Sequence, residues 1–420
     1  MVVRLLKSLR RSRIWLPGSL PWLPGDEPGI PRNGLVALYD PYLDAYGLDE
    51  GGRAALQTAI DRTGRGNHAT YGTTAGADAN DPSNTGLAYS YDGVDDVLTG
   101  IPSYVRSYVL AGDSYGIGAG WVYGKRTNVT GLVYYALFYN RRLSEAEEAT
   151  LYRLGQQILA SRGFTGTCYP WAFPIVTTAG TMDFSVKTTA GRLWVFPDGT
   201  TSTAEKPAPS LASGGTTWVY CPDWRDPALE LNDNTTDARY VGDLKDIPRV
   251  SYYLDLRNCA NITGSLADAP RVSYLLNLTN CSNITGALAD APRVSYYLNL
   301  YNCTNLTGSL ADAPRVSYLL ILYNCTKITG TLADAPRVSY YLDLRNCANI
   351  TGSLDGTWCP TYLYLKGIGW STAECDQTLI NFANGSLTNK SITISAGKRS
   401  SASDSAVATL ISRGWTVTES

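Results

Sequence analysis

The sequence predicts a mainly β protein in which a parallel-sheet solenoid follows smaller β domains. The first observation is a 22-residue unit that recurs five times without a slip, beginning at Pro248, Pro270, Pro292, Pro314 and Pro336. The second is an alternation of apolar and polar residues in each copy, which is typical of half-buried strands. The third is a chain rich in Gly (40) and Tyr (29) but poor in Phe (6) and Met (2). A fixed period of this size indicates a stack of short units that bury their apolar faces on one another.

The first half of each unit predicts a strand, and the second half predicts turns. In the first copy we expect inward side chains at Val250, Tyr252, Leu254 and Leu256. The outward side chains would then be Ser251, Tyr253, Asp255 and Arg257. Gly264 and the closing Leu-Ala-Asp-Ala-Pro run suit turns that return the chain to the next copy. Neighbouring copies would pair as parallel strands at roughly 4.8 Å per coil.

The unit resembles the cysteine-containing leucine-rich repeat, L-x-L-x-x-C-x-x-I-T. The matching residues of the first copy are Leu254, Leu256, Cys259, Ile262, Thr263 and Leu266. The resemblance implies a parallel sheet on one side of the solenoid. The Ala-Asp-Ala-Pro ending, which replaces a helical run, implies a tight convex side.

Five of the nine cysteines recur at one phase, namely Cys259, Cys281, Cys303, Cys325 and Cys347. A residue that recurs at one phase forms an internal column, and a free cysteine packs as a small apolar residue. We therefore expect buried thiols rather than disulfides or a metal site, and no Cys-x-x-Cys pair occurs. Whether Cys168 and Cys221 pair is left open.

The outward positions of the strands vary between copies, whereas the inward positions hardly change. One interpretation is a binding face, because Tyr and Arg are favoured at binding hot spots. The other is drift after recent duplication on an unconstrained surface. The candidate ligand-binding residues are Tyr253, Asp255, Arg257, Asn277, Tyr297, Asn299, Tyr301, Tyr323, Tyr341, Asp343 and Arg345.

Composition argues against several classes of function. A net charge of −2 gives no general basic field for nucleic acid. His68 is the one histidine, which argues against histidine-centred catalysis, and we assign no catalytic residue. The low charge with many Tyr, Thr, Ser, Asn and Gly residues is typical of extracellular or virion β proteins.

Residues 1–32 are basic and then proline-rich. The apolar stretch is too short and too broken for a secretory signal or a membrane span. The segment is either an anchor that docks on a larger assembly or an unstructured terminus.

Residues 33–163 predict a β domain that ends in a helix. Strands are expected near Gly34, near Ala88 and over Leu132–Tyr139, and Ser144 with Glu147 forms a capping box for a helix ending near Gly163. These segments resemble the concanavalin A-like, laminin-G-like jelly roll. That resemblance implies glycan or protein binding, in some members through calcium, and hydrolysis in others. Asp92, Asp95 and Asp96 form a weak candidate calcium site, with a polar surface turn as the alternative.

The remaining segments complete the predicted order of domains. Residues 164–229 predict a small β-sandwich module that caps the solenoid, which spans residues 230–354 and starts with an imperfect coil. Residues 355–420 predict an α/β cap whose residues cannot add another coil, with a capping box at Ser371 and a second helix ending before Gly414.

These observations lead us to expect a non-enzymatic recognition or attachment protein on a virion tail or a bacterial cell surface, contacting glycan or protein. The alternatives are a glycan hydrolase that works through residues 33–163, and a purely structural assembly subunit, including a homo-oligomer.

Overall fold

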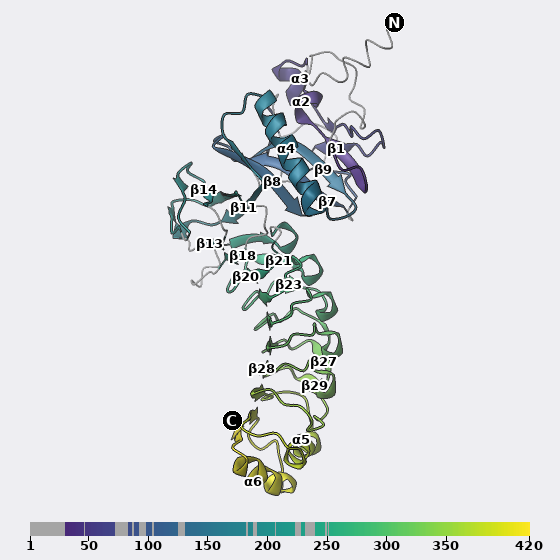
Figure 1. Cartoon of the computed structure of the whole chain (residues 1–420), viewed down its shortest axis with the longest axis vertical. Coiled ribbons are helices and arrows are strands. Elements are labelled where there is room, and N and C mark those ends of the chain that lie inside the picture. Colours follow the sequence, from purple (N-terminus) through teal and green to yellow (C-terminus); the bar gives the residue numbers. More distant parts are fainter. Residues whose placement is uncertain are drawn as a thin grey trace. The chain divides into compact units, whose positions relative to one another are not determined.

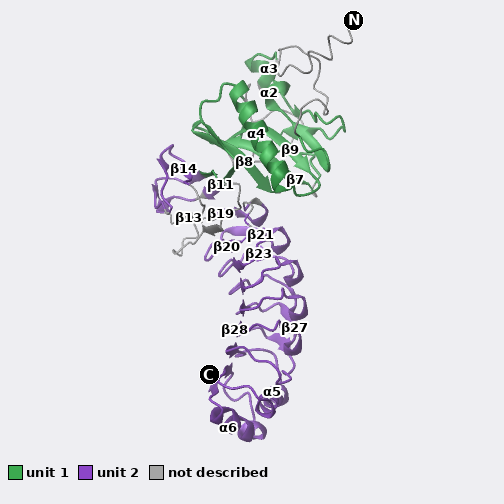
Figure 2. Cartoon of the chain, viewed as in Figure 1, with its two compact units in different colours: residues 1–174, 218–224 green, residues 175–217, 225–420 purple. Residues whose placement is uncertain are grey.

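The computed structural model describes most of the chain as two compact units. Described are residues 30–45, 47–71, 83–85, 88–91, 98–102, 105–124, 131–181, 184–187, 191–205, 207–222, 228–231, 240–247, 250 and 252–420. Unit 1 contains Met1–Pro174 and Trp218–Trp224, and unit 2 contains Ile175–Thr217 and Arg225–Ser420 (Figure 2). The fold is mainly β, as the sequence predicts.

Unit 1 is built on a seven-stranded mixed sheet (Figure 1). The strand order is β10-β8-β7-β9-β5-β4, and β1 also pairs with β9. The strands are β1 (Leu35–Tyr39), β4 (Ser83–Asn84), β5 (Tyr89–Tyr91), β7 (Arg106–Gly112), β8 (Gly118–Gly124), β9 (Gly131–Tyr139) and β10 (Thr167–Tyr169). Only the β10–β8 pair is parallel among these strands. A second, three-stranded sheet contains β2 (Thr58–Ala59), β3 (Ala69–Tyr71) and β6 (Leu98–Thr99).

Helix α4 (Glu145–Ser161) begins at the predicted capping box. The Ser144 side chain accepts from the Glu147 backbone N–H, and Glu147 reaches back to the Ser144 backbone. Inside the unit, the Trp121 indole donates to the Leu151 carbonyl at 2.8 Å, which ties the helix to β8. Two short helices, α2 (Pro41–Asp44) and α3 (Glu50–Ala54), follow β1. None of the described helices has the length and apolar character that a bilayer crossing needs.

The segment between α4 and the repeats includes the strands that start the solenoid. Its strands after β10 are β11 (Trp171–Thr177), β12 (Gly180–Thr181), β13 (Phe184–Lys187), β14 (Leu193–Val195), β15 (Thr201–Ser202), β16 (Ser210–Leu211), β17 (Gly215–Cys221), β18 (Ala228–Leu231) and β19 (Tyr240–Asp243). Strand β18 pairs in parallel with β20, and β19 pairs in parallel with β21. The segment near residue 230 therefore forms a first coil, as predicted.

The repeats stack in parallel and in register, with one coil per 22 residues. The main sheet runs β13-β18-β20-β22-β24-β26-β28-β30-β31-β32, and every pair from β18 onward is parallel. Its repeat strands are β20 (Tyr253–Asp255), β22 (Leu275–Asn277), β24 (Tyr297–Asn299), β26 (Leu319–Ile321) and β28 (Tyr341–Asp343). The predicted repeat solenoid is thus confirmed.

The second half of each coil is tight, as predicted. It holds the short strands β21 (Ile262–Ser265), β23 (Ile284–Thr285), β25 (Gly308–Ser309), β27 (Ile328–Thr331) and β29 (Asn349–Thr351). Single 3₁₀ turns follow the first four of these strands at η2 (Leu266–Asp268), η3 (Leu288–Asp290), η4 (Leu310–Asp312) and η5 (Leu332–Asp334), and η1 (Leu244–Asp246) follows β19 in the same way. The leucines that open these turns are fully buried, so the 3₁₀ turns close the core with three residues each.

The C-terminal region is an α/β cap that also lengthens the main sheet. It contains β30 (Tyr362–Tyr364), α5 (Thr372–Asn384), β31 (Ser391–Ile394), η6 (Ser401–Ser403), α6 (Asp404–Ser412) and β32 (Thr416–Glu419). The Ser371 capping box is present, and Gly414 has a φ of +80° after α6. We expected residues unable to add a coil. That prediction is wrong, because β31 and β32 extend the parallel sheet while α5 and α6 replace the 3₁₀ side.

Candidate binding face of the repeat sheet

A column of asparagines fixes the turn that ends each repeat strand. Asn258, Asn280, Asn302, Asn324 and Asn346 all have φ between 60° and 64°, a left-handed conformation that Asn tolerates better than most residues. The Asn280 amide donates to the Asn258 side-chain oxygen at 2.7 Å, and the next two coils repeat this bond at 2.8 and 3.0 Å. Every coil therefore presents its sheet face from an identically held turn.

The cysteine column lies directly behind these turns, and all nine cysteines are free thiols, Cys168 and Cys221 included. The Cys281, Cys303, Cys325 and Cys347 thiols donate to carbonyls of the preceding coil at 2.9–3.1 Å. Burial raises the pKa of the Cys281 thiol to about 12 and that of Cys303 well above its ordinary value. The thiols are therefore neutral, which confirms the predicted buried column.

The predicted site residues occupy three columns on the outward face of the repeat sheet. The first column is Tyr253, Leu275, Tyr297, Leu319 and Tyr341. The middle column is Asp255, Asn277, Asn299, Ile321 and Asp343. The third column, one residue beyond the last core leucine of each strand, is Arg257, Thr279, Tyr301, Tyr323 and Arg345.

Four of the five middle-column residues are buried although they lie on the outward face, and Ile321 is half-buried. Asp255 is 2% exposed, Asn277 4% and Asp343 1%. Long side chains of the two flanking columns fold over these short polar residues and bond to them. The middle column therefore positions its neighbours, and the residues of the first and third columns, except the buried Leu319, are half-buried and reach the surface.

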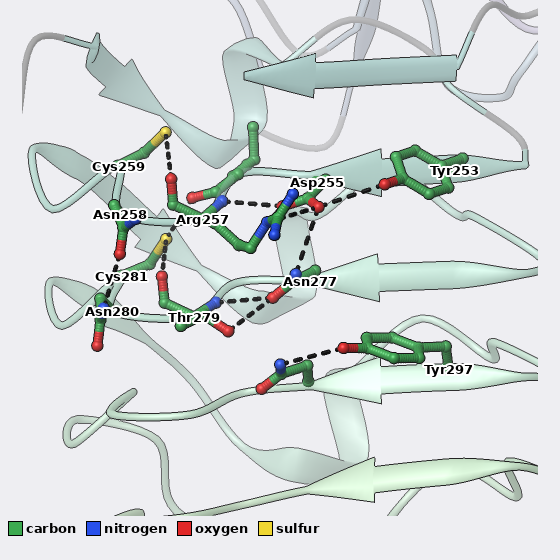
Figure 3. A network of polar contacts seen from close by, with 12 residues as sticks. Tyr253, Asp255, Arg257, Asn258, Cys259, Asn277, Thr279, Asn280, Cys281 and Tyr297 are labelled. Atoms are coloured by element: carbon green, nitrogen blue, oxygen red, sulfur yellow. Dashed lines mark hydrogen bonds and ion pairs between the residues drawn. The ribbon is translucent and has the colours of Figure 1, made fainter. Parts of the chain in front are cut away.

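Asp255 is the centre of the network at the N-terminal end of the face (Figure 3). It forms an ion pair with Arg257 at 2.9 Å, accepts from the Tyr253 hydroxyl at 3.3 Å, and accepts from the Asn277 amide at 3.3 Å. Asn277 in turn accepts from the backbone and the hydroxyl of Thr279. In the next coil the Asn299 amide donates to the Tyr297 hydroxyl at 3.4 Å. The network thus orients side chains of all three columns.

A second arrangement, at the C-terminal end of the face, stacks aromatic rings on an arginine. The Tyr301 and Tyr323 rings are stacked with centroids 4.4 Å apart. The Arg345 guanidinium lies 4.9 Å from the centroid of Tyr323 and 4.9 Å from that of Tyr364, while forming an ion pair with Asp343 at 2.5 Å. The Tyr341 ring lies 5.0 Å from Tyr364. Cation–π contacts of this kind contribute roughly 0.5–2 kcal/mol each.

Tyr252 was expected inside the coil, but it is 53% exposed. The prediction is wrong because the alternation breaks just before the strand. The backbone N–H groups of Tyr274 and Leu275 both donate to the Tyr252 carbonyl, an irregularity that turns the tyrosine outward. Tyr252, Tyr274, Tyr296, Tyr318 and Tyr340 instead form an outer stack with successive centroids 4.5–4.7 Å apart.

Sequence reasoning also missed two groups of polar residues. Tyr364 lies in the irregular coil after the repeats, so the 22-residue period did not predict its contact with Arg345. In unit 1, Asp44 accepts from the Tyr89 hydroxyl at 2.7 Å and forms an ion pair with Arg62. Its side chain is fully buried, and burial raises its pKa to about 6. Distant segments meet at Asp44, so no local pattern marks it.

No metal site emerges from the part of the chain that the structure describes. Within it, no group of three or more His, Cys, Asp or Glu side chains is placed to hold a metal ion. Asp92, Asp95 and Asp96, the weak candidate calcium ligands, lie outside the described residues.

Comparisons with known proteins add no relative. No family model matches the sequence, no curated protein matches it, and no solved structure matches the fold.

Proposed function

We propose that this chain is a non-enzymatic recognition or attachment protein that binds glycan through the outward face of its repeat sheet. The observation that carries the proposal is the combination, on that face, of stacked aromatic rings with arginines that are held by buried aspartates. Asp255 holds Arg257 at one end of the face, and Asp343 holds Arg345 against the Tyr301–Tyr323 stack at the other. Fixed aromatic and hydrogen-bonding groups lower the entropic cost of binding a ligand.

Glycan is favoured over a charged ligand because each arginine is neutralised by its own aspartate. Tyrosine offers a broad apolar ring and a polar tip, which suits sugar rings that have a C–H face and a hydroxyl edge. Display on a virion tail or a bacterial cell surface fits this role, as does the likeness of the repeats to cysteine-containing leucine-rich repeats. The likeness of residues 33–163 to concanavalin A-like domains adds a second proposed glycan-binding region.

The test is binding of the purified, labelled full chain to a printed array of neutral, acidic and amino-sugar oligosaccharides. The decisive variant combines Tyr301→Thr, Tyr323→Thr, Asp343→Asn and Arg345→Thr, which copies the Asn277–Thr279 pair of the second coil and leaves no carboxylate unpaired. The matched control is Tyr115→Ala, which removes a 53% exposed tyrosine of unit 1.

Binding by wild type and control, with at least a tenfold loss in the combined variant, would support the proposal. Binding that is equal in all three proteins would place recognition elsewhere in the chain. A wild-type protein that binds no sugar on the array would refute glycan recognition and leave a protein partner or an assembly role.

A further inference from the structure

The third column of the face lacks one ring. Along it, Tyr301, Tyr323 and Arg345 stack in consecutive coils, with neighbouring groups 4.4 and 4.9 Å apart. The preceding coil carries the small residue Thr279, and the coil before that carries Arg257. The Tyr301 ring therefore has a stacking partner on its Tyr323 side, and a threonine on the other.

The space over Thr279 has the thickness of one ring. Arg257 and Tyr301 lie two coils apart, which corresponds to roughly 9–10 Å at the spacing of paired strands. A ring in van der Waals contact on both faces needs about 7–8 Å. The structure contains an example of each of these two contacts: Tyr301 stacks on another ring, Tyr323, and Tyr364 stacks on an arginine, Arg345.

The groups beneath this position are polar and already oriented. The Thr279 hydroxyl donates to the Asn277 side-chain oxygen at 2.8 Å, so its own oxygen can still accept a hydrogen bond. The Asn277 amide is held by Asp255, and the Arg257 side chain is 40% exposed beside them. Figure 3 shows Arg257, Asn277 and Thr279 converging on this part of the face.

We infer that one pyranose ring of a neutral glycan inserts over Thr279, between Arg257 and Tyr301, and completes the stack. Its C–H face lies on the Tyr301 ring, its other face lies on the Arg257 guanidinium, and its hydroxyl edge meets the Thr279 hydroxyl. A neutral sugar is favoured because Asp255 cancels the charge of Arg257. An aromatic side chain of a protein would fit the thickness but would bring fewer hydroxyl groups to the polar side chains beneath it. This inference rests on the proposed glycan recognition and adds its location.

The test fills the position over Thr279 with a side chain of the protein itself. Thr279→Tyr supplies the missing ring, and the variant is expected to fold because two other coils carry Tyr at this phase, Tyr301 and Tyr323. Thr285→Tyr is the matched control, since Thr285 is an exposed threonine of the same coil on its other side. Both full-length variants and wild type are applied to the oligosaccharide array, and circular dichroism melting confirms that each is folded.

The expected result is at least a tenfold loss of binding in Thr279→Tyr and a change of less than twofold in Thr285→Tyr. A folded Thr279→Tyr protein that binds like wild type would overturn the inference while leaving glycan recognition standing. Absence of binding by wild type would refute both. Loss in Thr285→Tyr alone would place the sugar on the opposite side of the coil and would also overturn the inference.

Discussion

The Asn280 side-chain amide donates to the Asn258 side-chain oxygen one coil away, and both residues hold a left-handed backbone. This pair shows that one residue type meets two structural requirements of the repeat. Each turn needs a positive φ, and each partly buried amide needs a hydrogen-bond partner. A column of asparagines supplies both, so the outward face is reproduced in every coil with the same geometry.

Substitutions at Asn302 separate the contribution of the positive φ from that of the hydrogen bonds between asparagines. We expect Asn302→Ala to lower the free energy of unfolding by about 2–3 kcal/mol, because it loses two column hydrogen bonds and forces Ala into a left-handed φ. Asn302→Gly should be more stable than Asn302→Ala by about 0.5–1 kcal/mol, since Gly accepts that φ. Gly367 already occupies the corresponding position after the last repeat, with a φ of +76°. Urea unfolding measures both, and equal losses would contradict a role for φ.

The period, the cysteine column, the capping boxes and the strands were predictable because each depends on neighbours in sequence. The burial of Asp255 and Asp343 was not, because it depends on how Arg257 and Arg345 fold back over them. The prediction for Tyr252 was wrong because an alternating sequence pattern does not predict the irregular hydrogen bonds at the start of each strand. Tyr364 and Asp44 contact their partners only through tertiary packing, which the repeat period and local sequence patterns do not predict.

The Asp343–Arg345 pair should behave as a unit. Arg345→Thr alone leaves a carboxylate that is 1% exposed without its ion pair, and we expect a loss of about 2–3 kcal/mol in the free energy of unfolding. The double variant Asp343→Asn/Arg345→Thr reproduces the Asn277–Thr279 pair and should recover most of that loss. Thermal and urea unfolding give the double-mutant cycle. A double variant no more stable than the single one would contradict the pairing.

The buried thiols predict a loss of stability at alkaline pH. Burial raises the folded-state pKa of Cys281 and Cys347 from 9.0 to about 12, so the folded state favours the neutral thiol. Their contribution is complete below pH 9 and declines as the pH rises toward 12, because the unfolded chain then releases protons that the folded chain retains. We expect roughly 1 kcal/mol of lost stability per thiol by pH 10.

Urea unfolding at pH 8, 9 and 10 tests the alkaline effect. Tyrosines of the unfolded chain also ionise near pH 10, so the difference between wild type and a control that lacks these column thiols reports the thiols. The control replaces Cys281, Cys303, Cys325 and Cys347 with Ala and should show a flatter pH dependence. If the free energy of unfolding falls with pH as steeply in that variant as in wild type, the thiols are not the source of the pH dependence.

The glycine that follows each exposed threonine should resist substitution. Gly286 has a φ of +107°, and a Cβ there would lie 2.7 Å from the Ser265 hydroxyl and 3.0 Å from the Leu266 backbone nitrogen. We expect Gly286→Ala to cost more than about 2 kcal/mol. Gly397→Ala is the control, since Gly397 also has a positive φ but no atom within 4 Å of the added carbon. Equal unfolding midpoints for the two variants would show that the coil contact is unimportant.

The most direct test of the central proposal is hydrogen–deuterium exchange of the full chain with and without the best-binding oligosaccharide from the array. Recognition by the outward face of the repeat sheet predicts slower exchange in peptides that cover residues 275–301, whether or not unit 1 peptides are also protected. Protection confined to unit 1, with the repeat peptides unaffected, would contradict it.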